Sequence, residues 1–338
     1  MRKNLVLFIV MLSMTSFQLL DAQTTNSAYK IDKTIPLSGN GWWDYLSVDE
    51  VNKKIFISHG TQVNVVDLNT LEEIAVIPET KGVHGIAIAN DLNKAFISCG
   101  ADSSVLIIDL VSFKPVKKIN VSGKNPDCIL YDSFSKKVFT FNGRSSNATV
   151  IDAVSYKVIA TIPLAGKPEF SQTDGKGKIY VNIEDKNSIA VINAVSMKVE
   201  NLWPIEPGDE PSGLALDNEN HRLFSVCGNK LMIVTDANTG KVITSVPIGD
   251  GCDGVAFDAA SKRIFSSNGE GTMTVIQQES ADRYKVLENV TTMPGARTIT
   301  LHKVSHHLYL SGAELEAGTE RRPAKPDTFK VIDIKPVN

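Results

Sequence analysis

Apolar and polar residues alternate along most of the chain, in short runs separated by turn residues. Seven runs repeat one pattern, a basic or small corner followed by an alternating strand: KKIFISHG from Lys53, KAFISCG from Lys94, KKVFTFNG from Lys136, GKIYVNIED from Gly177, HRLFSVCG from His221, KRIFSSNG from Lys262 and HHLYLSGA from His306. Alternation with period two predicts half-buried β-strands, and no helical stripe accompanies it. The pattern therefore predicts an all-β chain built from repeats.

The spacing of the repeats predicts the architecture. The residue that closes the first strand of each unit is, in order, Asp49, Ala89, Asp132, Asp174, Asp217, Asp258 or His302, so successive units are 40 to 44 residues apart by subtraction. This period accommodates four short strands, which is one propeller blade. We expect one seven-bladed β-propeller with four antiparallel strands per blade, spanning residues 23–338 as a single domain although the length alone would suggest two.

The ends of the chain are expected to close the ring together. The last unit ends at FKVIDIKPVN without an outer strand, whereas YKIDKTIPL from Tyr29 matches the outer strand YKVIATIPL of another unit. Residues 27–37 are therefore predicted to complete blade seven, which removes an open sheet edge.

These repeats resemble one known family. The second-strand segments IFISHG, IYVNIE and LYLSGA, together with the recurring V-x-V-I-D and T-I-P elements, are similar to the YVTN-repeat (YncE-like) seven-bladed propellers over nearly the whole mature chain. The resemblance implies an extracytoplasmic propeller and leaves the ligand open, because this fold carries many functions. The Gly-His and Trp-Asp pairs of WD40 blades and the paired glycines of kelch blades are absent from the units.

The first residues have the features of a secretory signal. Arg2 and Lys3 precede the apolar run LVLFIVMLSM, and Leu20, Asp21 and Ala22 form a small-residue cleavage pattern. The apolar run is shorter than the roughly 20 residues that a membrane span needs. We expect residues 1–22 to be a signal peptide cleaved near Ala22, and the mature protein to be periplasmic or secreted.

The charge balance argues against nucleic acid as a partner. The formal net charge is -3, and the only concentrated basic segment is Arg321, Arg322 and Lys325. Affinity for nucleic acid rests on a basic stripe that neutralises phosphates. Gly-x-Gly at Gly269–Gly271 lies in a blade turn without the strand and helix context of a nucleotide site. We expect a monomer that binds a small molecule or a cell-envelope protein.

Propeller geometry indicates where chemistry would lie. First strands begin, and second strands end, on the same face, so their side chains gather at one mouth of the central channel. Five places before each first-strand marker lie the ring residues: Asp44, His84, Asp127, Glu169, Ser212, Asp253 and Arg297. The second strands add a further layer: His59, Cys99, Asn142, Arg144, Glu184, Cys227 and Asn268.

This mouth is predicted to bind a ligand. Carboxylate and amide oxygens are ligands for hard cations such as Ca²⁺, so we expect a divalent cation at Asp127, Glu169, Asn142 and Glu184. His84, between two acids of the ring, is a candidate general base. Arg297 would bind a ligand anion or neutralise its acidic neighbours. The alternative is that these residues serve only turns and strand entries, for which Asp is favoured.

For the two tryptophans near the mouth and for one long segment, the sequence allows two interpretations each. Trp42 and Trp43 offer a stacking surface, or else one packs between blades and the other covers the rim. The long segment 312–328 in blade seven is a lid or partner contact, or a disordered insertion. His302, His306 and His307 are interpreted as surface residues on the opposite face.

The four cysteines form two pairs at the mouth. Cys99 and Cys128, and Cys227 and Cys252, end one blade and open the next. An oxidising compartment favours two disulfides with this pairing, and the alternative is four buried thiols.

Three function classes remain. The first is a binding or scaffolding propeller acting through the polar mouth. The second is a lactonase-type hydrolase, in which a bound cation polarises a carbonyl and His84 or a carboxylate moves the proton. The third is a protein-interaction module that uses the rim and the segment 312–328.

Overall fold

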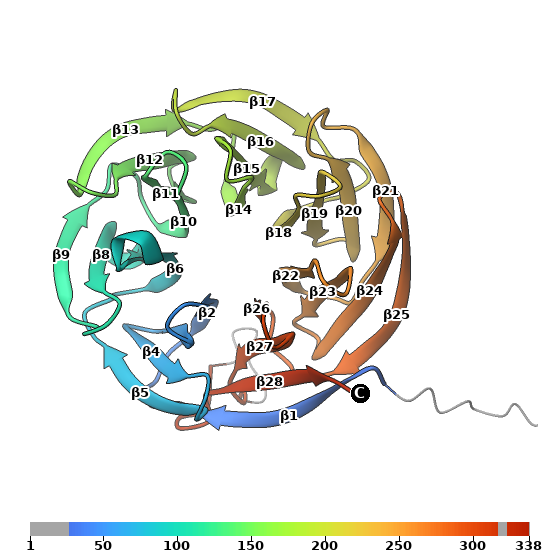
Figure 1. Ribbon diagram of the computed structural model, residues 1–338, viewed down its shortest axis with the longest axis horizontal. Helices are drawn as coiled ribbons and strands as arrows, with labels where there is room; N and C mark the ends of the chain where they lie inside the picture. The colour runs from blue at the N-terminus through green and yellow to red at the C-terminus, as the bar shows by residue number, and fades with distance from the viewer. Residues whose placement is uncertain (1–26, 317–322, 338) are drawn as a thin grey trace, which may run out of the picture.

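Seven four-stranded antiparallel sheets surround a central channel, and the chain passes from blade to blade in sequence order (Figure 1). This computed structural model describes residues 27–316 and 323–337, so the predicted signal peptide lies outside the described residues. The seven-bladed β-propeller is confirmed. In these two ranges the helical segments are three short 3-10 turns: η1 (Asn90–Leu92), η2 (Gly100–Asp102) and η3 (Glu184–Lys186). None of the helices described is long and apolar enough to cross a membrane.

Each of the first four blades runs from an inner strand at the channel to an outer strand at the rim. Blade one contains β2 (Trp43–Asp49), β3 (Lys54–His59), β4 (Gln62–Asp67) and β5 (Glu72–Ile77). Blade two contains β6 (Val83–Ala89), β7 (Lys94–Cys99), β8 (Ser104–Asp109) and β9 (Pro115–Asn120). Blade three contains β10 (Pro126–Asp132), β11 (Lys137–Asn142), β12 (Asn147–Asp152) and β13 (Lys157–Pro163). Blade four contains β14 (Pro168–Thr173), β15 (Lys178–Ile183), β16 (Ser188–Asn193) and β17 (Lys198–Pro204).

The remaining blades close the ring. Blade five contains β18 (Pro211–Asp217), β19 (Arg222–Cys227), β20 (Leu231–Asp236) and β21 (Val242–Pro247). Blade six contains β22 (Cys252–Asp258), β23 (Arg263–Asn268), β24 (Thr272–Ser280) and β25 (Arg283–Thr291). Blade seven contains β26 (Ile299–His302), β27 (His307–Gly312), β28 (Lys330–Pro336) and β1 (Tyr29–Pro36). β1 pairs with β28 from Tyr29↔Pro336 to Pro36↔Lys330, which confirms the predicted closure by the N-terminal strand.

One aromatic side chain in every second strand anchors the core. These residues occupy the same position of the repeat and are buried in all seven blades: Phe56, Phe96, Phe139, Tyr180, Phe224, Phe265 and Tyr309. The apolar faces of neighbouring blades pack together, as where Phe56 and Val65 of blade one join Ile86 and Ile97 of blade two in one cluster. A blade alone could not bury these faces, so the repeats depend on one another.

The polar residues of the repeat serve its turns. In every blade the residue before the second strand has a positive φ: Lys53, Asn93, Lys136, Gly177, His221, Lys262 and His306. The Asp that ends the third strand accepts backbone N–H groups of the following turn, as Asp236 does from Asn238 and Thr239. Arg222 of the second strand pairs with this same Asp at 2.7 Å. The basic corner and the V-x-V-I-D motif are therefore structural.

Candidate functional site

A local break in the inner strands directs the ring residues into the channel mouth. The pairing of first and second strands shifts register between Trp43 and Leu46 in blade one and between Pro126 and Ile129 in blade three. Equivalent shifts occur in blades two, four, five and six. Such bulges reorient side chains at the rims of sheets. In blade seven, Arg297 precedes the short strand β26 and needs no bulge.

The seven ring residues line one cavity of about 400 Å³ at the mouth. The lining also includes Glu184 from the predicted second layer, Cys252, and three residues that the sequence analysis did not select: Tyr45, Lys167 and Glu210. The inner strands that carry the ring meet around the centre of the molecule (Figure 1). The structure thus places the ring as the spacing predicted.

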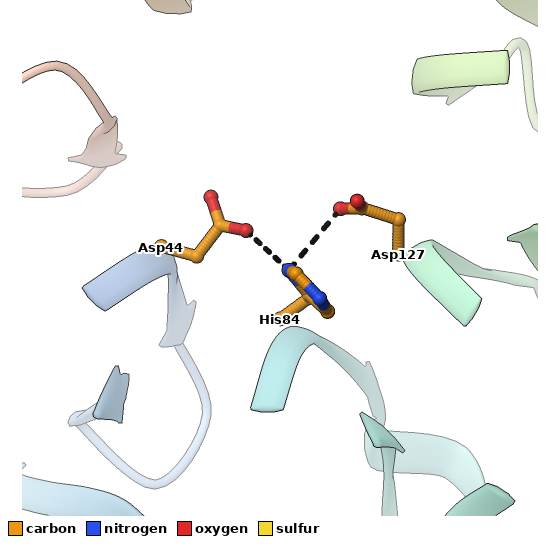
Figure 2. Close-up of side chains that lie close together, drawn as sticks. All are labelled: Asp44, His84 and Asp127. Carbon is orange, nitrogen blue, oxygen red and sulfur yellow. Dashed lines mark hydrogen bonds and ion pairs between the residues drawn. The ribbon is translucent and has the colours of Figure 1, made fainter. Parts of the chain in front are cut away.

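His84 lies between two carboxylates from neighbouring blades (Figure 2). Its Nδ1 is 2.6 Å from Asp44 Oδ2 and 3.6 Å from Asp127 Oδ1. Burial opposes a charged imidazole, but the hydrogen bond to Asp44 and the charge of Asp127 outweigh it and raise the pKa of His84 to about 9. A pKa raised in this way favours the imidazolium, so His84 would act as a general base only where it can release that proton, and this role stays a prediction.

Lys167 forms the second charged group of the mouth. Its Nζ lies 2.7 Å from Glu169 Oε1 and also pairs with Glu184 Oε2. Burial raises the pKa of Glu169 to about 8, helped by the charge of Asp127 and opposed by Lys167. Glu169 therefore holds a proton over much of the neutral range.

Arg297 and Asp253 form the third charged group. Arg297 Nη1 lies 3.1 Å from Asp253 Oδ2, and the Ser212 hydroxyl donates to Asp253. The charge of Asp253 raises the pKa of Arg297, whereas burial raises the pKa of Asp253 in spite of this pairing. Arg297 thus neutralises an acid of the ring, the second of its two predicted roles.

Carboxyl groups outnumber cationic groups in this cavity. Six carboxyl groups line it, and the cationic groups among its lining residues are Lys167, Arg297 and His84. Burial and the charge of Asp44 raise the pKa of Asp127, although His84 acts in the opposite direction. Six carboxyl groups against three cationic groups give this cavity an acidic lining, so the mouth favours a cation as ligand.

Two aromatic rings meet below the mouth. Tyr45 of blade one meets Phe170 of blade four edge to face, with 5.2 Å between ring centroids. Tyr45 lines both the mouth cavity and a second cavity of about 300 Å³, which continues down the channel between the inner strands. The two rings therefore divide the channel into an acidic upper chamber and a more apolar lower chamber.

Most of the predicted second layer does not reach the mouth. Asn142 is buried within blade three, where its Nδ2 donates to Asn147 and Thr149, and Asn268 has the same role in blade six. Arg144 is exposed and does not line the cavity. His59 stacks on Phe329, with 3.9 Å between centroids. Of the four residues predicted to hold a cation, Asp127, Glu169 and Glu184 line the mouth, whereas Asn142 does not, because its amide is used within its own blade. Lys167 pairs with both glutamates.

A repeat signal could have identified two of the missed residues. Lys167 and Glu210 each lie two places before a ring residue, in the turn that leads into the inner strand, so the same repeat position recurs in blades four and five. Tyr45 directly follows a ring residue, where other blades have the glycines Gly85, Gly213 and Gly254. A Cβ at Gly213 would lie 2.9 Å from Asp253 O, so small residues are needed where inner strands approach closely.

Hydroxyls of the second strands, and Thr298 at the start of blade seven, hold the backbone of the ring. Ser98 Oγ accepts from Gly85 N at 2.8 Å and donates to Asp127 O at 2.6 Å. Thr298 Oγ1 donates to Asp44 O at 2.7 Å, and Asp44 N donates to Ser58 Oγ at 2.9 Å. These contacts fix the ring residues from behind, so the mouth is organised before any ligand enters.

The cysteines are free and buried in the structure. Cys252 Sγ lies 3.1 Å from the backbone oxygen of Cys227, and Cys128 Sγ lies 3.2 Å from Ser171 Oγ. The preferred disulfide pairing is therefore absent here, and the alternative of four buried thiols describes the structure.

The two tryptophans have different environments. Trp43 is buried beside Phe329, and its Nε1 donates to Gly295 O at 3.2 Å. Trp42 is 56% exposed and lines a recess that Arg297, Leu315 and Pro323 also line. One tryptophan thus packs in the core while the other covers the rim.

The segment 312–328 is partly described. Leu315 and Ala324 form an isolated β-bridge, and Lys325 pairs with Glu314. Residues 317–322 lie outside the described residues, so the prediction of a lid or a disordered insertion stays open there.

The three C-terminal histidines are less exposed than we predicted. His306 Nδ1 lies 2.9 Å from Asp258, His307 Nδ1 lies 2.7 Å from the buried Asp333, and His302 pairs with Glu50. All three are partly buried on the face opposite the mouth, and each one pairs with an acid.

Comparisons with known proteins support the fold. No family model and no curated protein sequence matches the chain. Among solved structures, the chain is similar to hydrazine synthase of Kuenenia stuttgartiensis, with a TM-score of 0.71, 16% identity, and 83% of this chain and 95% of that chain covered. It is also similar to the RRP9 WD40 repeats, with a TM-score of 0.77, 10% identity, and 90% and 97% covered. A chain of the mitotic checkpoint complex matches with a TM-score of 0.73, 13% identity, and 96% and 99% covered. At these identities the likeness establishes the propeller fold alone.

Proposed function

We propose that this protein is an extracytoplasmic binding propeller that takes a small, positively charged ligand in the mouth of its central channel. The observation that carries the proposal is the composition of one cavity, which six carboxyl groups and three cationic groups line. A cavity with a fixed lining and convergent polar groups is the usual form of a ligand site.

Electrostatics select the sign of the ligand. Burial, and after it the charge of neighbouring acids, raises the pKa of Asp127 and Glu169, and an entering cation would favour their ionised forms. An anion would be repelled by the same acids, and the cationic groups are already engaged: Arg297 by Asp253, Lys167 by two glutamates. We therefore expect ammonium-bearing molecules or metal cations to bind, and carboxylates of similar size not to bind.

The proposed location and family rest on the sequence. The signal-like residues 1–22 and the YVTN-like blades support an address in the periplasm or outside the cell. Fractionation of cells that express the full chain would test this. We expect a mature form that begins near Gln23, and a cytoplasmic, unprocessed chain would contradict the proposal.

Calorimetric titration with putrescine, glucosamine, glucose, succinate and zinc tests the ligand class. We expect at least one of the cationic probes to bind and the neutral and anionic probes to give no heat. The double variant Glu169→Gln, Asp253→Asn should weaken binding at least tenfold. Its control is the double variant Glu219→Gln, Asp282→Asn. These two exposed acids lie on the opposite face, where Glu219 pairs with Lys262 and Asp282 pairs with Arg222, so binding should be unchanged. No binding by any cationic probe would overturn the proposal.

A hydrolase is the second candidate function. A carboxyl group that stays protonated, such as Glu169, beside ionised acids is an arrangement suited to general acid and base catalysis. We expect lactone hydrolysis, followed by base uptake at constant pH, to be lost in Glu169→Gln if this activity exists. Hydrolysis that persists in the variant would remove this role.

An interaction module is the third candidate, supported by the exposed Trp42 next to the segment 312–328. Replacing Trp42 by Ala should then abolish capture of a cell-envelope protein and leave cation binding intact. Equal loss of both would place the partner at the mouth itself.

A further inference from the structure

Three side chains from three successive blades bring metal-ligating atoms together at the mouth. One atom each of Asp44, His84 and Asp127 lies within 4.8 Å of the other two (Figure 2). We propose that these residues bind one divalent first-row transition metal ion, of which zinc is the representative. This inference rests on the proposed function, because it names the cation that the acidic mouth takes.

The distances fit such an ion with small adjustments. Ligand atoms about 2.0–2.2 Å from zinc in a tetrahedral site lie about 3.4 Å from one another. His84 Nδ1 and Asp127 Oδ1, at 3.6 Å, already have this separation. Asp44 Oδ2, at 2.6 Å from the same nitrogen, must move outward by less than 1 Å as the ion replaces the hydrogen-bonded proton.

Tyr45 places a hydroxyl group beside this cluster. The residue is 9% exposed and lines the same cavity as the three ligands, and within the described residues its hydroxyl makes no hydrogen bond. The hydroxyl is therefore available to a water bound to an ion at the neighbouring cluster.

The donor atoms select the class of metal. An imidazole nitrogen with two carboxylate oxygens suits zinc, cobalt, nickel or manganese, whereas calcium takes six to eight oxygen ligands. The sequence led us to expect a hard cation such as calcium because Asp127, Glu169, Asn142 and Glu184 all offer oxygen ligands. The cluster in the structure shares only Asp127 with that set and adds the imidazole of His84. Three protein ligands would leave a position open toward the cavity, which is the form of a catalytic rather than a structural zinc site.

The support behind the ligands favours binding. Ser58 and Thr298 hold the backbone of Asp44, and Ser98 holds the backbone of Asp127. Ligands fixed in this way pay little conformational entropy when the ion arrives.

The test is a zinc titration of the mature protein after dialysis against a chelator, read by calorimetry and by metal analysis after gel filtration. We expect one zinc per chain. His84→Gln and Asp44→Asn should each weaken binding at least tenfold, whereas His221→Gln, which replaces an exposed histidine on the opposite face, should bind as the wild type does. Cobalt in place of zinc should give a visible absorption band that His84→Gln lacks.

Each alternative outcome is decisive. Thermal unfolding must show that each variant keeps its fold. If His84→Gln fails to fold, Asp44→Asn is the variant in which loss of zinc binding is measured. Zinc that binds equally to His84→Gln would lie elsewhere and would overturn the inference. If putrescine or glucosamine binds and zinc does not, the metal site is wrong and the proposed function stands; if no cation binds, both fall.

Discussion

Tyr45 and Phe170 meet across the central channel, 5.2 Å apart at their ring centroids, although they belong to blades one and four. Propeller blades mainly contact their neighbours along the ring, so this pair is a direct link between non-adjacent repeats. It separates the acidic chamber from the chamber below, which Leu46, Ile86, Ile129 and other inner-strand residues line. The mouth cavity and the cavity below it therefore meet at Tyr45.

Removing the Tyr45 ring should join the two chambers. We expect Tyr45→Ala to lower the free energy of unfolding by about 3–5 kcal/mol, because a large buried aromatic leaves a cavity that its surroundings cannot fill. Tyr45→Phe keeps the ring, and because the hydroxyl has no partner in the described structure it should cost less than about 1 kcal/mol. Urea denaturation of both variants measures the difference. Equal losses would show that the hydroxyl, and not the ring, matters for stability.

The closing strand should be as important as any core strand. Tyr29 of β1 is buried, packs edge to face on Phe265 at 5.1 Å, and accepts a hydrogen bond from Arg263 at 3.0 Å. We expect Tyr29→Ala to cost about 3–5 kcal/mol, although it lies at the first described strand. Lys30→Ala, an exposed change in the same strand, should stay within about 0.5 kcal/mol. Thermal or urea unfolding that shows a small effect for Tyr29→Ala would mean that the ring is held without β1.

Glu169 should make stability depend on pH. Its pKa is about 8 in the folded protein against an ordinary value of 4.5, so the folded state holds a proton that the unfolded chain releases. The contribution is fully present below about pH 4.5 and is lost as pH rises through 8. Glu169→Gln, which never ionises, should gain stability relative to wild type between pH 5 and pH 9, on the order of 2 kcal/mol.

Urea denaturation at several pH values in a metal-free buffer measures this gain. The control is Glu219→Gln, whose exposed side chain should produce no such trend. A difference between Glu169→Gln and wild type that stays constant from pH 5 to pH 9 would show that Glu169 ionises normally in the folded protein.

The four thiols should be inert in the native protein. Burial raises the pKa of Cys99 to about 11 and the pKa values of Cys128, Cys227 and Cys252 to about 12. Thiolate is the reactive form, so we expect almost no reaction with a thiol reagent at pH 8 and four reactive thiols after unfolding. Fewer than four thiols in the unfolded, unreduced protein would reveal a disulfide.

Much of this architecture is legible in the sequence because the repeat fixes equivalent positions. The ring from Asp44 to Arg297 could be selected by counting from the strand ends, and the closing strand could be matched by its pattern to outer strands elsewhere. Side-chain direction could not be obtained in this way. Asn142 and Glu184 both lie at the end of a second strand, yet Asn142 points into its own blade and Glu184 lines the mouth.

Contacts across the ring also could not be predicted from the sequence. Nothing local to Tyr45 or Phe170 indicates that the two rings meet, since this depends on the diameter of the closed ring and on the small residues between them. The protonation of His84 likewise depends on two acids that lie 40 and 43 residues away by subtraction of their numbers, and their distances follow only from the folded blades. Sequence spacing predicted neighbours on the ring, but not the charge that those neighbours impose.

Ser98 and Ser311 provide a matched comparison of the hydroxyls behind the ring. Both are buried and lie two places after the core aromatic of their strands. Ser98 bonds Gly85 and Asp127, whereas Ser311 Oγ has no partner among residues 27–316 and 323–337. Ser98→Ala should lower the free energy of unfolding by about 1–3 kcal/mol, because it leaves two backbone groups without their hydrogen-bond partner. Ser311→Ala should be neutral or stabilising. Ser98→Ala should also weaken cation binding at the mouth, since Asp127 loses its backbone support. Urea denaturation and calorimetric titration of the two variants measure these effects, and equal behaviour of the two would show that the hydroxyls do not position the site.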